Sequence, residues 1–243
     1  MPALPLRVLQ LLAVWLLTAV IGLSLIALIV VSFGILGEVV GRSFLRAWGR
    51  ACLWVCRVEL VVEGAEHLAG RRPRIITFNH GSTLDSYVVN ALLPDRGTPV
   101  TRRSLIWVPV MGQVMALGPI LMVDRGNGAR ARRVLARAAE RVRREGLSVV
   151  IAPEGTRKGE DKPSRFKLGA FELARATGAP IVPMVILGAD RLMPYGRYWS
   201  APGRVVVRVL PPRDTSRFTE ADLRAEAEAL REVYRAEMRA FAG

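Results

Sequence analysis

Residues 75–85 read Ile-Ile-Thr-Phe-Asn-His-Gly-Ser-Thr-Leu-Asp, an apolar run that passes directly into a polar segment. The first four residues are β-branched or aromatic, which is typical of a strand. His80, one of only two histidines in the chain, follows this run, and Asp85 lies five residues further on. Open α/β sheets usually bind ligands at the carboxyl ends of their strands, so this placement predicts a functional role for His80.

His80 and Asp85 could act together as a dyad. If the segment after Phe78 is a loop that turns back, Asp85 can reach one imidazole nitrogen, fix the tautomer and leave the other nitrogen as a general base. On an uninterrupted helix, residues five apart point about 140° away from each other, so the dyad requires the loop. Ser82 and Asp85 also fit a capping box, and Asp85 would then only cap a helix. Both interpretations stay open at the level of sequence.

The chain beyond residue 57 alternates short β-branched runs with helical stretches. The predicted strands cover residues 58–63, 74–78, 120–123, 148–152, 181–186 and 205–210. A helix over about 129–145 carries a stripe of arginines that faces solvent or anionic lipid, and the pattern does not separate the two. A terminal packing helix opens with a capping box at Thr219 and Asp222. This alternation predicts a layered α/β domain.

The N-terminal part is strongly apolar. Residues 8–37 contain no charged side chain, and this run exceeds the roughly 20 residues needed to cross a hydrocarbon core. No small-x-small cleavage site follows closely, so we expect a segment that enters the bilayer rather than a signal peptide. Arg7 alone precedes the run, whereas four arginines follow it by residue 57. The positive-inside rule therefore predicts an inner (cytoplasmic) membrane protein whose larger domain faces the cytoplasm.

Residues 1–57 are thus predicted to be a membrane-anchoring helical segment, and residues 58–243 a second, larger domain. Between residues 42 and 57 arginine recurs at every fourth position and aromatic residues accompany it, which suits a helix at the headgroup level. The residues concerned are Arg42, Phe44, Arg46, Trp48, Arg50 and Trp54. Two arrangements stay open: a helical hairpin that dips into one leaflet, or a spanning helix followed by an ordinary surface helix.

Charge and cysteine content indicate which macromolecular partners and metal sites to expect. The formal net charge of +14 requires an anionic partner or surface, and both nucleic acid and phospholipid headgroups qualify. Together with the apolar segment, we expect an anionic membrane surface and no nucleic acid. Cys52 and Cys56 lie four residues apart in an apolar stretch without a histidine cluster, so we interpret them as packing residues and expect no metal site.

Four ordered motifs carry a resemblance to a known family. They are Asn79-His80 with Asp85, Val123-Asp124-Arg125, Pro153-Glu154-Gly155-Thr156-Arg157, and Ile181-Val182-Pro183. In this order, and with Phe166-Lys167-Leu168-Gly169 between the last two, they resemble the motifs of the glycerolipid acyltransferase family. The resemblance covers about residues 75–190. It implies a layered mixed sheet flanked by helices, with an N-terminal membrane-embedded helical segment and a catalytic domain at residues 58–243.

The resemblance also implies an activity. The protein would transfer a fatty acyl group from acyl-CoA or acyl-carrier protein to the sn-2 hydroxyl of lysophosphatidic acid, with no other cofactor. His80 would be the base and Asp85 its partner. The residues expected to bind substrate are Arg125, Glu154, Gly155, Thr156, Arg157, Lys167 and Gly169. The alternatives are a structural turn for Glu154, Gly155 and Thr156, a helix-entry feature for Lys167 and Gly169, and solvation at the surface for Arg125 and Arg157. Pro183 is expected to end a strand at the pocket floor.

Other functions stay open. Val123, Ala152 and Lys158 stand where the family usually has other residues, so the acceptor could be another lysolipid such as lyso-ornithine lipid or a lysophospholipid. Hydrolysis with Ser82 or Ser86 as nucleophile is a second class, although neither serine lies in a G-x-S-x-G elbow. A catalytically silent membrane-binding protein is a third. The sequence does not predict the oligomeric state.

Overall fold

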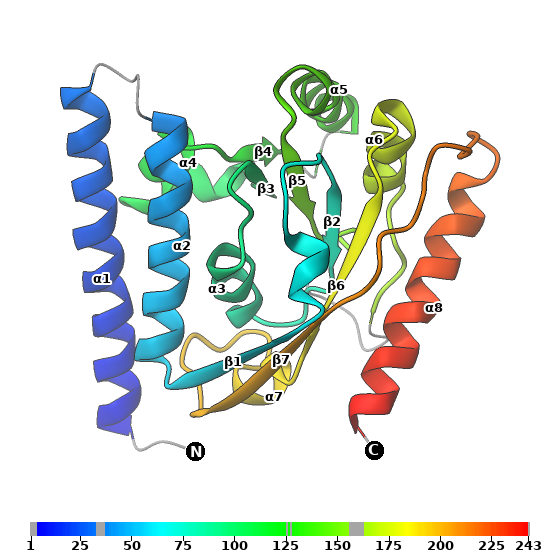
Figure 1. Cartoon of the computed structure of the whole chain (residues 1–243). Helices are drawn as coiled ribbons and strands as arrows, with labels where there is room; N and C mark the ends of the chain where they lie inside the picture. Colours follow the sequence, from blue (N-terminus) through cyan, green and yellow to red (C-terminus); the bar gives the residue numbers. More distant parts are fainter. Residues whose placement is uncertain (1–3, 33–36, 125, 127, 156–162, 243) are drawn as a thin grey trace.

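The computed structural model describes residues 4–32, 37–124, 126, 128–155 and 163–242 (Figure 1). Its centre is a seven-stranded sheet with the order β1-β7-β6-β2-β5-β3-β4. Neighbouring strands run parallel except β6 and β7, which are antiparallel, so the sheet is mixed, as the resemblance implied. The strands are β1 (Val58–Glu63), β2 (Ile75–Phe78), β3 (Gly97–Arg102), β4 (Leu121–Val123), β5 (Ser148–Ile151), β6 (Ile181–Leu187) and β7 (Gly203–Val209).

Helices cover both faces of this sheet (Figure 1). They are α1 (Leu4–Val31), α2 (Gly37–Val55), α3 (Leu84–Ala91), α4 (Met111–Leu117), α5 (Gly128–Glu145), α6 (Gly169–Thr177), α7 (Ala189–Leu192) and α8 (Leu223–Ala242), with 3₁₀ turns at Ala65–Leu68 and Arg103–Trp107. One apolar core lies between the sheet and α2 and α3, and a second lies between the opposite face and α5, α6 and α8. The predicted layered α/β architecture, a sheet flanked by helices, is confirmed.

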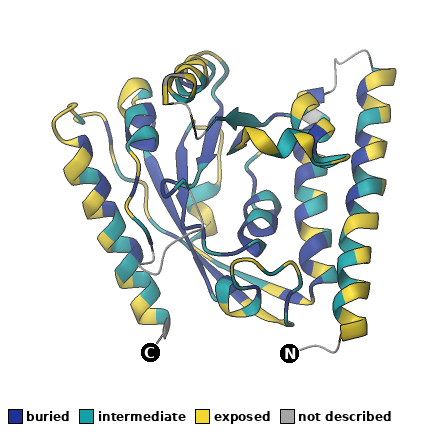
Figure 2. Cartoon of the chain, turned by 180° about the vertical axis from the view of Figure 1, so that it is seen from behind, coloured by how far each residue is buried: buried dark blue, intermediate teal, exposed yellow. Residues whose placement is uncertain are grey.

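Strand β6 shows how the two cores form. Val182, Met184 and Ile186 belong to the first core, whereas Ile181, Val185 and Leu187 belong to the second. Successive side chains of a strand point to opposite faces, so a strand covered on both faces needs a continuous apolar run. All seven residues of β6 are buried, and the central strands are dark in the burial view (Figure 2).

Six strands lie where the sequence predicts them, and β3 was missed. Its residues, Gly-Thr-Pro-Val-Thr-Arg, include a single β-branched apolar side chain, Val100, beside a glycine and a proline. Gly97–Pro99 pair with β5, and Val100–Arg102 pair with β4. The strand therefore changes partner next to Pro99, which lacks an N–H for the ladder.

Pro183 does not end a strand, which corrects the expectation. It is the third residue of β6, and its carbonyl accepts the N–H of Leu210 at 2.8 Å. The antiparallel ladder begins at Met184 opposite Val209, while Ile181 forms a bridge with Arg213. The two pairs are three residues apart on β6 but four residues apart on the partner segment, so the ladder is irregular between them. Pro183 lies at this irregular point, where its missing N–H is tolerated.

The two N-terminal helices lie side by side along the domain (Figure 1). Among the described residues, α1 is the one helix long and apolar enough to cross a membrane. Trp48 of α2 donates its indole N–H to Thr18 of α1 at 3.0 Å, and Gln10 of α1 accepts the backbone N–H of Ser200 at 2.7 Å. The boundary near residue 57 stays a prediction, but α2 packs on α3 as part of the first core.

The arginines of α2 are not all at a headgroup surface, which corrects a second expectation. Arg42 is buried and donates from Nε to the carbonyl of Gly97 at 3.1 Å, and Arg46 pairs with Asp95 at 2.7 Å. The fourfold spacing does place these arginines on one face, but that face meets the turn before β3. Arg50 and Trp54 remain exposed.

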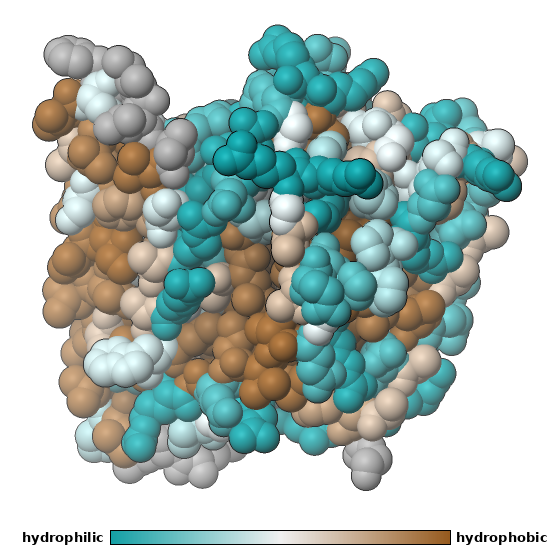
Figure 3. Space-filling view, in the orientation of Figure 1, coloured by the Kyte–Doolittle hydropathy of each residue, from teal (hydrophilic) through white to brown (hydrophobic). Residues whose placement is uncertain are grey.

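Helix α5 has the predicted amphipathic pattern. Ala138 and Val142 are buried, whereas Arg133 and Arg137 are exposed. Polar side chains accordingly gather over α5 at the top of the space-filling view (Figure 3). The terminal helix is also confirmed: Thr219 donates its N–H and its hydroxyl to Asp222, one residue before α8 begins.

Candidate active site

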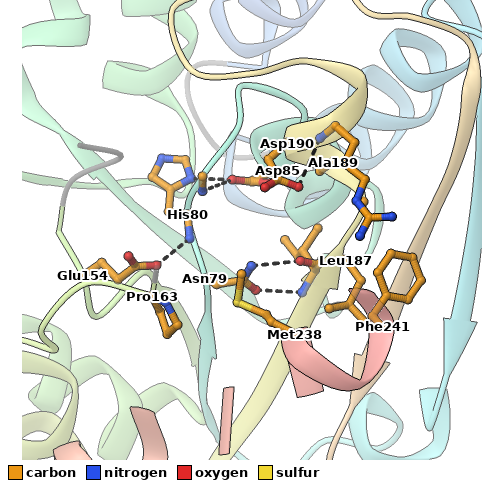
Figure 4. Close-up of a pocket in the computed structure, with 14 residues that line it drawn as sticks. Asn79, His80, Asp85, Glu154, Pro163, Leu187, Ala189, Asp190, Met238 and Phe241 are labelled. Atoms are coloured by element: carbon orange, nitrogen blue, oxygen red, sulfur yellow. Dashed lines mark hydrogen bonds and ion pairs between the residues drawn. The ribbon is translucent and has the colours of Figure 1, made fainter. Parts of the chain in front are cut away.

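The loop between β2 and α3 brings His80 and Asp85 together. Strand β2 ends at Phe78 and α3 begins at Leu84, so residues 79–83 form the loop that a dyad requires. His80 Nδ1 lies 3.1 Å from Asp85 Oδ2, and both side chains are buried (Figure 4). The predicted contact is therefore present in the structure.

Asp85 caps the helix start and orients His80 with the same oxygen. Oδ2 also accepts the backbone N–H groups of Gly81 at 2.8 Å and Ser82 at 2.7 Å. The Ser82 hydroxyl in turn accepts the N–H of Leu84 at 3.1 Å. The capping box and the dyad are thus two parts of one arrangement, because three donors converge on one carboxylate oxygen and fix its position.

This contact determines which imidazole nitrogen carries the proton. An ionised carboxylate can only accept hydrogen bonds, so in the neutral tautomer that fits this contact the proton is on Nδ1 and Nε2 is the acceptor nitrogen. The edge-on ring of Phe78, with centroids 5.6 Å apart, packs against the imidazole. Such an imidazole can take a proton from a hydroxyl group at Nε2, as in other His-carboxylate pairs.

Asn79 attaches the same loop to the neighbouring strand. Its Nδ2 donates to the carbonyl of Ile186 at 2.8 Å, and its Oδ1 accepts the N–H of Ile186 at 2.7 Å. The side-chain amide thereby pairs with β6 as a strand residue would, just after β2 has ended. Sequence reasoning gave Asn79 no role of its own, and its position beside the histidine was the available signal.

Glu154, after β5, holds the backbone of His80. Its Oε1 accepts the His80 N–H at 2.8 Å (Figure 4). Its Oε2 accepts the N–H of Ser164 at 2.7 Å and the Ser164 hydroxyl at 2.9 Å. Both carboxylate oxygens are engaged by protein donors. The geometry therefore gives Glu154 a structural task, and its predicted contact with substrate stays a prediction.

Gly155 and Lys167 lie against each other beside Glu154. Gly155 has φ +67°, and a Cβ there would stand 2.9 Å from Lys167 Cε. The backbone N–H of Lys167 bonds to the carbonyl of Pro153 at 2.8 Å, and its side chain is exposed. Only glycine combines this backbone angle with this close approach. The lysine is therefore held next to the third motif.

The remaining predicted substrate residues are Gly169, which has a packing contact, and three residues that the structure does not describe. Gly169 begins α6, and a Cβ there would lie 2.8 Å from Leu135 of α5, so this glycine permits close packing of two helices. Arg125, Thr156 and Arg157 lie outside the described residues. Their predicted contacts with a phosphate stay predictions.

A pocket opens beside the dyad and reaches the C-terminal helix. It is lined by the β2 loop, Glu154 and Pro163 on one side and by β6, α7 and α8 on the other. Met238 and Phe241 of α8 line its far part, where the guanidinium of Arg191 lies 5.4 Å from the centroid of the Phe241 ring. Sequence reasoning treated α8 as packing only. The apolar face through Tyr234 and Phe241 was the signal, but it does not say which cavity that face meets.

Ser82 and the two cysteines bear on two other kinds of chemistry, a serine nucleophile and a metal site. Ser82 is fully buried, and its hydroxyl donates to the carbonyl of Met193 at 2.6 Å, which is not the setting of a nucleophile. Cys52 and Cys56 are free thiols buried in the first core. In the part of the chain that the structure describes, no three His, Cys, Asp or Glu side chains are grouped as metal ligands would be.

Comparison with known proteins adds the family. The acyltransferase family model matches residues 59–187, which include the dyad and Glu154. The 1-acyl-sn-glycerol-3-phosphate acyltransferase alpha of Mus musculus is 36% identical over 180 residues, covering 74% of this chain and 62% of that protein. The 1-acyl-sn-glycerol-3-phosphate acyltransferase of Limnanthes alba is 30% identical over 186 residues, covering 76% of this chain and 66% of that protein. The chain thus spans slightly less than two thirds of the length of these relatives.

A solved structure shows the same fold. The crystal structure of the 1-acyl-sn-glycerophosphate (LPA) acyltransferase PlsC from Thermotoga maritima superposes with a TM-score of 0.74 at 24% identity, covering 95% of this chain and 94% of that one. The mixed sheet and its flanking helices are therefore those of that protein. Because the acyltransferase family model matches more than half of its length, the chain belongs to the acyltransferase family.

Proposed function

We propose that this protein is a membrane-associated acyltransferase that moves a fatty acyl group from a thioester donor, acyl-CoA or acyl-carrier protein, to the sn-2 hydroxyl of lysophosphatidic acid. The product is phosphatidic acid. The observation that carries the proposal is the 3.1 Å contact between His80 Nδ1 and Asp85 Oδ2, which assigns Nε2 as the basic nitrogen. The relatives from Mus musculus and Limnanthes alba are both named 1-acyl-sn-glycerol-3-phosphate acyltransferases, which supports the choice of substrates.

The proposed reaction uses this geometry. Nε2 of His80 takes the proton of the acceptor hydroxyl as its oxygen attacks the thioester carbonyl. The tetrahedral intermediate then expels the donor sulfur as a thiolate, which recovers the proton from the imidazolium. Asp85 stabilises the imidazolium between the two steps. The acyl group passes directly to the acceptor oxygen, so no acyl-enzyme is formed.

The proposal assigns the acceptor phosphate to the basic residues of the second and third motifs. Arg125 and Arg157 would supply forked guanidinium donors, and Thr156 would complete that pocket. Lys167 supports this assignment because its side chain lies against Gly155, directly before that segment. Glu154 contributes by holding the backbone of His80.

Membrane association is the second element of the proposal. The outward face of α1 exposes apolar side chains along its whole length, and these gather at the left of the space-filling view (Figure 3). They include Leu4, Leu9, Leu12, Trp15, Leu16, Val20, Leu23 and Val30. An apolar surface of this extent on a protein that acts on lipids favours insertion into the bilayer. The arginines after α1 favour the cytoplasmic side of the inner membrane for the catalytic domain.

The hairpin arrangement has specific support. Helix α1 is held to the larger domain at Gln10, which bonds to Ser200, and at Gly22, where a Cβ would stand 2.5 Å from Val110. A helix that contacts the domain at two points along its length cannot be surrounded by lipid on all sides. We therefore favour a position in one leaflet, with only the outer face of α1 in lipid. In that position the site stays at the interface, where a lysolipid can reach it by lateral diffusion.

An acceptor panel tests the proposal. Purified protein in detergent receives lysophosphatidic acid, lysophosphatidylcholine or lyso-ornithine lipid, each with acyl-CoA and with acyl-carrier protein, and thiol release is followed over time. We expect release that depends on lysophosphatidic acid and yields phosphatidic acid. Faster thiol release with lyso-ornithine lipid or lysophosphatidylcholine would show that this lipid, and not lysophosphatidic acid, is the preferred acceptor. Thiol release without any acceptor would instead indicate hydrolysis.

A further inference from the structure

Tyr234 of α8 is a fully buried side chain whose hydroxyl reaches the central sheet. The hydroxyl donates to the carbonyl oxygen of Thr77 at 2.8 Å and accepts the backbone N–H of Met184 at 3.2 Å. Since its single proton is directed to that carbonyl, the Thr77 hydroxyl, 3.0 Å away, donates to it as a third partner. Residue 234 lies outside the segment matched by the family model, which ends at residue 187.

The three partners belong to one rung of the sheet. In the parallel register of β2 and β6, Thr77 faces Pro183 and Phe78 faces Met184. The Met184 N–H and the Thr77 carbonyl are therefore the two ends of a single ladder position. One tyrosine hydroxyl is bonded to both ends, so it clamps β2 to β6 near the point where β2 ends.

This clamp lies three residues before His80. Two residues after Thr77, the amide of Asn79 pairs with both backbone groups of Ile186, and His80 follows directly. The end of β2 is thus attached to β6 first by the Tyr234 hydroxyl and then by the Asn79 amide. Only Phe78 and Asn79 separate Thr77 from His80, and Asn79 is itself bonded to β6, so a displacement of Thr77 also displaces His80.

Packing alone does not require this hydroxyl. The ring of Tyr234 meets Phe166 edge-on, with centroids 5.5 Å apart, and a phenylalanine could make the same contact. Burial raises the pKa of Tyr234, and the charge of Glu154 adds to the rise, so the hydroxyl keeps the proton that it donates. Glu154 itself holds the His80 backbone N–H, which places Tyr234 near both attachments of the histidine.

We propose that Tyr234 is a positioning residue for His80, so that the C-terminal helix contributes to the placement of the base through this one side chain. Its hydroxyl fixes the end of β2 relative to β6, and this end determines where the imidazole stands in the pocket. Tyr234 itself touches no reacting atom. The consequence for turnover rests on the proposed acyltransferase function, whereas the consequence for the placement of His80 does not.

The kinetic test compares Tyr234→Phe with Leu230→Ala. Leu230 lies one turn earlier on α8 in the same core, fully buried, and bonds to neither β2 nor β6 through its side chain. At 25 °C we expect Tyr234→Phe to lower kcat at least about tenfold with the KM of both substrates within twofold. Leu230→Ala should lower Tm at least as far but keep kcat within twofold. A Tyr234→Phe enzyme with wild-type kcat, or a loss of kcat that follows Tm in both variants, would overturn the proposal.

A second readout does not depend on activity. The chain has two histidines, His67 and His80, so ¹³C-histidine labelling gives two imidazole signals, which a His67→Gln variant assigns. Tyr234→Phe should shift the His80 signal and leave the His67 signal in place, and Leu230→Ala should shift neither. An unmoved His80 signal in Tyr234→Phe refutes the positioning role. Absence of acyl transfer in the wild-type protein would instead refute only the proposed reaction.

Discussion

Glu154 Oε1 accepts the backbone N–H of His80 at 2.8 Å, so two segments about seventy residues apart in sequence meet at the histidine. The other oxygen of Glu154 holds Ser164 beyond the third motif. One carboxylate thus connects the loop that carries the base with the segment that is proposed to bind the acceptor. The two residues can meet because His80 follows β2 and Glu154 follows β5. These strands are parallel neighbours, so their carboxyl ends lie at the same edge of the sheet.

Replacing Glu154 by glutamine should weaken both attachments. Glutamine offers one carbonyl oxygen where the carboxylate offers two acceptors, so an N–H of His80 or of Ser164 loses its partner in a buried place. We expect a loss of about 1–3 kcal/mol in the free energy of unfolding and a fall in kcat. Ser164→Ala removes only a hydroxyl bond and should lower kcat less. Equal kcat values in the two variants would show that the His80 bond is not what matters.

Asp85→Asn tests the orientation of the imidazole. The amide can no longer act as a charged acceptor for Nδ1–H, the Gly81 N–H and the Ser82 N–H together. The wrong tautomer should become populated and kcat should fall about 100-fold or more, with KM little changed. Asp95→Asn, which removes an exposed partner of Arg46, is the control and should keep wild-type kcat. A fully active Asp85→Asn enzyme would contradict the dyad.

Gly155→Ala separates backbone strain from close contact. The native φ of +67° is unfavourable for alanine by about 1–2 kcal/mol, and the new Cβ would also meet Lys167. Gly178 has φ +66° with nothing within 4 Å of the corresponding Cβ, so Gly178→Ala carries the strain alone. We expect Gly155→Ala to be the less stable variant in chemical denaturation and to raise the KM for the acceptor. Equal stabilities would mean that the lysine moves aside freely.

The pH dependence of stability should report the buried Tyr234. Burial raises its pKa in the folded protein, whereas in the unfolded chain it ionises near pH 10. Its contribution is therefore fully present below pH 10 and is lost as the pH rises above that value, by up to about 1.4 kcal/mol per unit. The difference in unfolding free energy between the wild-type protein and Tyr234→Phe should shrink from pH 9 to pH 11. A constant difference would contradict burial of the hydroxyl.

The local geometry of the dyad could be predicted because its signals are local. A β-branched run, a polar loop and a capping pattern within residues 75–85 indicate where β2 ends and α3 begins, and they allow Asp85 either to reach His80 or only to cap the helix; the structure shows that it does both. Strand β3 could not be predicted in the same way, because its glycine and proline carry no strand signal and its pairing with β5 and β4 comes from the assembled sheet.

Contacts between distant elements could not be predicted from the sequence either, because they arise only when the elements pack together. The spacing of Arg42 and Arg46 gives a shared helix face, but only the packing of α2 shows that this face meets the segment before β3 rather than lipid headgroups. The apolar stripe of α8 likewise predicts burial of Tyr234 without indicating that its hydroxyl reaches Thr77. Periodicity identifies a face, and tertiary structure decides its neighbour.

Transfer of an acyl group to lysophosphatidic acid by His80→Ala, compared with His67→Ala, tests the account most directly. His67 lies in the 3₁₀ turn at Ala65–Leu68, so its removal controls for loss of an imidazole elsewhere in the chain. With phosphatidic acid quantified by mass spectrometry, we expect His80→Ala to lose about 100- to 10,000-fold in rate while its Tm stays close to the wild-type value, and His67→Ala to stay within twofold. A His80→Ala protein that is folded and keeps more than about a tenth of the wild-type rate would contradict a base at this position.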